Sequence, residues 1–71
     1  MNDAAIRLLR SSLANADREF RSAADTARRT MEEAERHPTA WANVASHAVL
    51  AAHAAGQVEA CHDALVAAGE L

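Results

Sequence analysis

Apolar residues recur at alternating spacings of three and four along the first half of the chain. They are Ile6, Leu9, Leu13, Ala16, Phe20, Ala23, Ala27, Thr30 and Ala34, with Met31 beside the weakly apolar Thr30. This a/d heptad pattern continues without Gly or Pro and is typical of an amphipathic helix that packs against another helix. The spacing predicts one long helix over about 3–36, with Asn2 or Asp3 as its N-cap.

The second half of the chain begins at Pro38 and is also rich in alanine. A residue before proline is disfavoured in the α region, so His37 should end the first helix near Arg36. Thr39 is then expected to cap a second helix over about 39–55. The apolar side expected for this helix consists of Trp41, Val44, Ala45, Ala48, Ala52 and Ala55.

Gly56 interrupts the apolar pattern of the second half. On a uniform helical wheel the apolar direction turns by about 100° there, towards Val58, Cys61, Ala64, Leu65 and Ala68. Because glycine is a poor helix former, we expect a kink or a break at Gly56, followed by a continuation or a third helix over about 57–68 that Gly69 ends. A kinked arm gives an antiparallel helical hairpin, whereas a break gives a three-helix bundle. The matched lengths of the two arms favour the hairpin.

The chain is short for a stable core. Its 71 residues form at most one domain, and alanine supplies much of the 51% hydrophobic content. A domain of this size is marginal as a monomer, so we expect the single helical domain 1–71 to dimerise into a four-helix bundle or to bind a larger protein. The expected interface residues are Ile6, Leu9, Leu13, Phe20, Met31, Trp41, Val44, Val49 and Leu50.

Charge is concentrated in the first half. All seven arginines precede Pro38, on the helix side opposite the apolar stripe, and seven acidic residues in the same segment offset them. Three pairs have the i,i+4 spacing that favours ion pairs: Asp17 with Arg21, Asp25 with Arg29, and Glu32 with Arg36. We therefore interpret the arginine side as a solvated helix face. The formal net charge of −3 also argues against a polyanionic partner.

The side chains that could carry chemistry are poorly placed for it. His47, His53, Cys61 and His62 include zinc-ligand types, but on one helix their spacings direct them to different sides. Cys61 as a nucleophile would need a base beside it, and the adjacent His62 points elsewhere. We therefore expect no metal, no cofactor and no catalytic residue. One cysteine, no signal-peptide layout and no long apolar run favour a cytoplasmic protein without a membrane contact.

These features predict a non-enzymatic helical interaction module, such as an accessory factor, adaptor or inhibitor. Its size alone suggests a phage- or plasmid-encoded protein, and a structural assembly subunit is an alternative. In size and layout the Pro38 hairpin resembles the Rop-type RNA-binding hairpin. That resemblance implies a nucleic-acid-binding role, for which Arg7, Arg18, Arg21 and Arg29 are the candidate residues.

Overall fold

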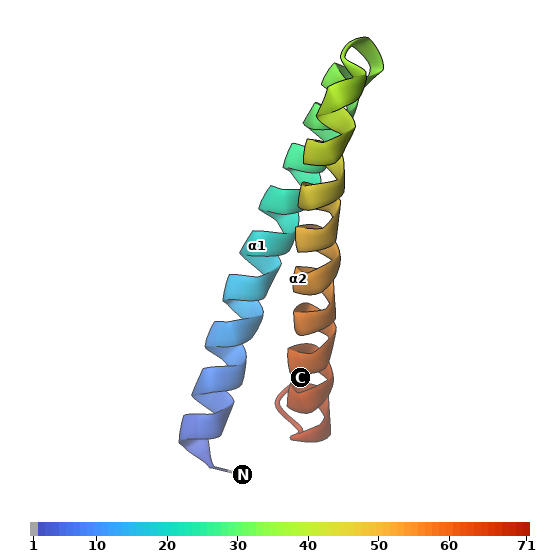
Figure 1. The fold of residues 1–71 in the computed structure, drawn as a ribbon. Coiled ribbons are helices and arrows are strands. Elements are labelled where there is room, and N and C mark those ends of the chain that lie inside the picture. The colour runs from blue at the N-terminus through green and yellow to red at the C-terminus, as the bar shows by residue number, and fades with distance from the viewer. Residues whose placement is uncertain (1) are drawn as a thin grey trace.

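Two long helices joined by a tight turn form the structure. The computed structural model describes residues 2–71. Helix α1 spans Asp3–Arg36, the 3₁₀ turn η1 spans Pro38–Ala40 and helix α2 spans Trp41–Ala67. The helices lie side by side and antiparallel, with both termini at the same end of the molecule (Figure 1). The predicted all-α helical hairpin is confirmed, whereas its pairing into a bundle stays a prediction.

Helix α1 begins and ends where its sequence predicts. Oδ1 of Asn2 accepts a hydrogen bond from the backbone N–H of Ala4 at 2.7 Å, which makes Asn2 the N-cap. At the other end, His37 has the extended backbone expected before a proline, with φ −132° and ψ 91°. The N–H of His37 still donates to the carbonyl of Glu33 at 2.8 Å, which closes the last turn of the helix.

The connection between the helices differs from the expectation. Pro38 is the first residue of η1, where its missing N–H leaves no hydrogen bond unmade. The N–H of Ala40 donates to the carbonyl of His37 at 2.9 Å and closes this turn around Thr39. Helix α2 then begins at Trp41, with Ala40 as an N-cap that makes no side-chain bond. The prediction that Thr39 caps the second helix is therefore wrong.

Helix α2 continues through Gly56 without interruption. The predicted break is wrong, and the three-helix bundle is not adopted. Glycine costs about 1 kcal/mol relative to alanine in a helix interior, which a 27-residue helix packed along its length against α1 can offset. Only Gly69 has a positive φ among residues 2–71, at 78°.

Gly69 ends the second helix, as predicted, in a Schellman motif. The N–H of Glu70 donates to the carbonyl of Leu65 at 2.9 Å, and the N–H of Gly69 donates to the carbonyl of Val66 at 3.0 Å. These two bonds satisfy carbonyls that would otherwise lack partners at the helix end. The turn also directs Glu70 and Leu71 back towards α1.

The boundary between the helices is lined mainly by alanine. The residues buried there are Ala16, Ala27, Ala34, Ala40, Val44, Ala51, Ala54 and Leu65. Along α1 the predicted heptad positions are buried or half-buried from Ile6 to Ala34, except Phe20, which is 37% exposed. We call the matching set on the second helix the α2 seam: Ala40, Val44, His47, Ala51, Ala54, Val58, Cys61, Leu65 and Ala68, all buried or half-buried.

The α2 seam corrects the apolar side expected for residues 39–55. Its members alternate in spacing by four and three across Gly56, so the buried direction does not turn there. Trp41, Ala45, Ala48 and Ala52, which were expected inside, are exposed. Only Val44 of the expected set is buried. Alanine lies on every side of this segment, so the single large Trp41 dominated the predicted phase.

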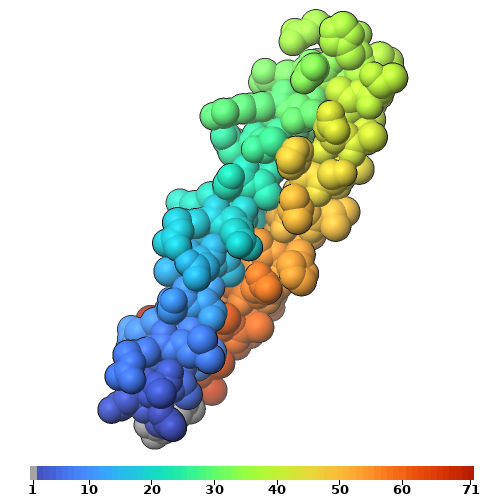
Figure 2. Space-filling view, turned by 60° about the vertical axis from the view of Figure 1, so that its left-hand side comes forward, coloured from blue at the N-terminus to red at the C-terminus, as the bar shows by residue number. Residues whose placement is uncertain are grey.

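The hairpin is a thin rod measuring 52 × 15 × 15 Å (Figure 2). In Figure 1 the helices lie closest near the turn and separate towards the termini. The side chains explain this difference. Ala34 and Ala40 let the backbones approach at the turn end, whereas Leu13 and Leu65 hold the helices further apart at the open end.

Candidate interaction surface

Helix α2 has a second apolar side that nothing in the hairpin covers. We call it the outer face of α2, and it consists of Trp41, Ala45, Ala48, Val49, Ala52 and Gly56, all exposed. At about 100° per residue this face is centred about 130° from the adjacent part of the α2 seam. Trp41 is 49% exposed and Val49 is 68% exposed. The outer face therefore presents large apolar side chains at one end and in the middle, with small residues between them.

The sequence around this face carries no charge. From Trp41 to Val58 there is no Asp, Glu, Lys or Arg, although α1 bears charged residues along most of its length. A helix side that faces solvent normally carries charged or strongly polar residues. The outer face of α2 is thus unlike the exposed side of α1.

The interface residues predicted from the sequence fall into three groups. Ile6, Leu9, Leu13 and Val44 lie between the two helices of the hairpin, half-buried or buried. Trp41 and Val49 lie on the outer face of α2. The remaining predicted residues, Phe20, Met31 and Leu50, are exposed by 37%, 43% and 57%; Phe20 and Met31 lie on α1, and Leu50 lies on α2 at the border of the outer face.

Leu50 illustrates how the predicted set divides. It lies on the flank of α2 beside a shallow groove between the helices, with His47 and His53 from α2 and Arg18 and Thr26 from α1. Leu50 also lines a shallow, mostly apolar hollow on α2 together with Ala45, Ser46 and Val49. Leu50 therefore borders the outer face and extends the apolar surface around Val49.

The sequence interpretation missed four residues of the outer face: Ala45, Ala48, Ala52 and Gly56. The three alanines were placed inside the hairpin, and Gly56 was interpreted as a helix breaker. Two signals could have identified them. One is the uncharged run around them, and the other is a glycine that the helix tolerates at a cost.

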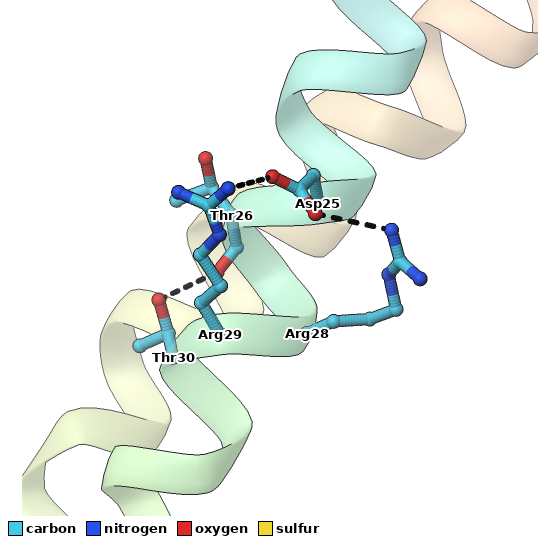
Figure 3. A network of polar contacts seen from close by, with 5 residues as sticks. All are labelled: Asp25, Thr26, Arg28, Arg29 and Thr30. Atoms are coloured by element: carbon cyan, nitrogen blue, oxygen red, sulfur yellow. Dashed lines mark hydrogen bonds and ion pairs between the residues drawn. The ribbon is translucent and has the colours of Figure 1, made fainter.

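Three of the seven arginines of α1 pair with acids of the same helix. Asp25 binds two guanidinium groups, with Arg28 at 3.1 Å and Arg29 at 2.8 Å (Figure 3). Next to them, the hydroxyl of Thr30 donates to the backbone carbonyl of Thr26 at 2.7 Å, a hydrogen bond between consecutive turns of the same helix. The polar contacts in Figure 3 are therefore all local to α1.

The other candidate phosphate-binding arginines differ in their partners. Arg21 pairs with Asp17 at 3.0 Å, and Arg18 donates to the uncharged side chain of Asn15. The Asp17–Arg21 and Asp25–Arg29 pairs are the i,i+4 pairs predicted from the sequence. The third predicted pair, Glu32 with Arg36, is not among the ion pairs of residues 2–71. Arg7, near the start of α1, is exposed.

Cys61 and three of the four histidines are dispersed along α2, and His37 is the C-cap of α1. His47 and Cys61 lie half-buried in the α2 seam, whereas His53 and His62 are exposed on other sides. Within the described part of the chain, no three His, Cys, Asp or Glu side chains are grouped so that they could hold a metal ion. Cys61 is not in a disulfide.

Neither helix of residues 2–71 combines the length and the apolar character that crossing a membrane requires. Among the surfaces described above, the outer face of α2 is the one that combines exposed apolar side chains with a segment free of charged residues.

A comparison of the chain with known protein families, curated proteins and solved structures finds no match.

Proposed function

We propose that the protein is a small, non-enzymatic interaction module that binds another protein helix through the outer face of α2. The observation that carries this proposal is the exposed apolar stripe from Trp41 to Gly56 within a segment that has no charged residue. Small side chains at Ala45, Ala48 and Ala52 let a partner helix approach closely, and Trp41 supplies a large anchor.

The total surface of the hairpin supports this role. Its accessible area is 5021 Å², whereas a compact protein of 7.5 kDa exposes about 4,200 Å². The excess of about 800 Å² is close to the area that one partner buries in a standard protein interface, about 800 Å². Binding one more helix would therefore bring the exposed area of the chain to the value usual for its mass.

The small side chains buried between the two helices also support a protein partner. Of the eight buried residues among those described, six are alanines, and only Val44 and Leu65 have larger side chains. An alanine side chain removes little apolar area from water, so the hairpin alone gains little hydrophobic stabilisation. A partner on the outer face would add the apolar contacts that the hairpin boundary lacks.

The nucleic-acid alternative has weaker support. A phosphate-binding face needs cationic groups that are available to the backbone of the polymer. Asp17 and Asp25 offset the charges of Arg21 and Arg29 on the same helix, and the chain as a whole carries a net charge of −3. We therefore propose a protein partner for the module.

The proposal is tested with Ala48→Glu, which places a charge in the middle of the outer face. Ala14→Glu is the matched control, because Ala14 is an exposed alanine of α1. Tagged versions of the three proteins are examined for self-association and for partners captured from nuclease-treated and untreated lysates of the source organism.

We expect Ala48→Glu to abolish the associations that the wild type and Ala14→Glu share, with the helical content of all three unchanged. Associations that survive Ala48→Glu would contradict the proposal, as would a wild type that neither self-associates nor retains a protein. Capture that is lost only after nuclease treatment would favour the nucleic-acid alternative.

A further inference from the structure

Gly56 has no role inside the hairpin. It lies in the interior of α2 on the exposed side, its φ is not positive, and a Cβ built there would meet nothing within 4 Å. Alanine would fit this position and would favour the helix more. A helical glycine without an intrachain reason indicates that another group approaches the backbone closely at this point.

The spacing of the outer face identifies a group that could fill this position. When two α2 helices run antiparallel around a two-fold axis between Ala48 and Val49, residue i of one chain lies opposite residue 97 − i of the other. Trp41 then lies opposite Gly56, Ala45 opposite Ala52, and Ala48 opposite Val49. Every residue of the outer face therefore lies opposite another residue of the outer face. Trp41, the largest side chain, lies opposite Gly56, which has no side chain, and symmetry repeats this contact at the other end.

We propose that the partner helix is α2 of a second copy of this chain, packed antiparallel in this register. The inference rests on the proposed function and names its partner. A two-fold dimer uses the same surface on both copies and requires that surface to be self-complementary, which the outer face of α2 is. The two α1 helices then lie on the outside, and the assembly is an open row of four helices with the α2 pair at its centre.

Charge and area agree with this pairing. Across the contact from Trp41 to Gly56 there is no like-charge pair to oppose, because the segment is uncharged. One turn further along α2, Glu59 lies opposite Pro38 of the other copy and beside its His37, and both Glu59 and His37 are exposed. The surface in excess of a compact monomer, about 800 Å² for each copy, matches the half-interface of a standard dimer.

This arrangement differs from the bundle expected from the sequence. Of the residues expected between chains, Ile6, Leu9, Leu13 and Val44 are covered by the hairpin itself, whereas Trp41 and Val49 belong to the outer face of α2. A dimer that forms without opening the hairpin needs a different apolar surface, and the outer face of α2 is one that both copies present.

Sedimentation equilibrium of the purified full chain is the first test. We expect the wild type and Ala14→Glu to dimerise and Ala48→Glu to sediment as a monomer, because the two-fold axis brings the two introduced carboxylates together. Circular dichroism checks that the variants keep their helices. A wild type that stays monomeric up to about 1 mM, a Kd that corresponds to only about −4 kcal/mol, overturns the inference. The proposed function would still stand if Ala48→Glu abolished capture of another protein.

A second test examines the contact between Trp41 and Gly56. Gly56→Leu should raise the dimer Kd by about 100-fold, because symmetry applies the clash with the indole ring twice. Gln57→Leu adds a similar side chain to the neighbouring exposed position, away from the outer face, and should leave the Kd within about threefold of the wild type. Equal effects of the two variants would overturn the assigned register.

Disulfide formation tests the direction of the helices. In a Cys61→Ser background, mixed Ala45→Cys and Ala52→Cys chains should form a disulfide with each other, because these positions face one another across the axis. Each variant alone should not form one, because identical residues lie seven positions apart along the paired helices, or about 10 Å, beyond the reach of a disulfide. Rapid bonding of Ala45→Cys chains to themselves would show a parallel pair or a different antiparallel register and would contradict the proposal.

Discussion

Arg10 and Glu70, 60 positions apart in the sequence, are joined by a hydrogen-bonded ion pair of 2.9 Å between Nη2 and Oε1. The pair connects the third turn of α1 to the short segment that follows α2. It forms because the Schellman turn at Gly69 reverses the chain directly after the helix. The contact lies at the open end of the hairpin, where the helices are furthest apart (Figure 1).

This ion pair should contribute little to stability. The side chains of Arg10 and Glu70 are 51% and 38% exposed, so solvent screens their attraction. A double-mutant cycle with Arg10→Gln and Glu70→Gln should give a coupling free energy below about 1 kcal/mol. The measurement is thermal unfolding at low salt and again at about 1 M salt, where the Debye length is about 3 Å. A larger coupling that persists at high salt would contradict this assignment.

The two glycines should respond to alanine with opposite signs. Gly69→Ala forces an L residue to a φ of 78° and should destabilise the hairpin by about 1 kcal/mol. Gly56→Ala should stabilise the hairpin by up to about 1 kcal/mol, because the position is helical and open. Both free energies of unfolding are measured in the Ala48→Glu background, so that changes in chain pairing do not contribute. The same sign for both variants would show that Gly56 is not an ordinary helical position.

Leu65 should dominate the stability of the hairpin. It is 1% exposed and is the largest side chain that the described structure buries fully, whereas its neighbour Val66 is 48% exposed. Leu65→Ala should cost about 2–5 kcal/mol, enough to unfold much of so small a protein. Val66→Ala should change the free energy of unfolding by less than about 1 kcal/mol. Urea unfolding followed by circular dichroism compares the two, and similar losses would indicate that the chain packs differently around Leu65.

The arginine side of α1 should not bind nucleic acid. Asp17 and Asp25 offset the charges of Arg21, Arg28 and Arg29, and the net charge of the chain is −3. Titration of a labelled RNA duplex should give no binding at about 50 mM salt, the condition that most favours phosphate contacts. Binding that is present there and falls steeply by about 200 mM would restore Arg7, Arg18, Arg21 and Arg29 as a functional set.

Helix α1 could be predicted from the sequence because its apolar and charged residues lie on clearly different sides of the helix. Leucines and a phenylalanine at heptad positions alternate with arginines and acids, so one side of the helix is clearly apolar. Its ends are equally clear, with Asn2 able to cap the first turn and Pro38 unable to continue the last. Local chemistry and helix packing select the same 34 residues.

The phase of α2 could not be predicted in this way. Alanine occupies the α2 seam at Ala51 and Ala54 and the outer face at Ala48 and Ala52, so the apolar pattern is similar in both directions. Packing against α1 chooses between them, because α1 presents its own seam at a fixed spacing. Gly56 was misleading for a related reason. A single unfavourable residue cannot stop a helix whose remaining turns are held by a neighbour.

Ala34, at 1% exposure, and Ala40, at 7%, set the distance between the two helices beside the turn η1. A methyl group is the smallest side chain that a chiral residue offers, so almost every substitution at these positions would insert a wedge there. Because the turn fixes one end of both helices, such a wedge would be magnified into a wide gap some 40 Å away, at 1.5 Å per residue. The geometry of the whole rod is therefore set by two methyl groups beside its tightest turn.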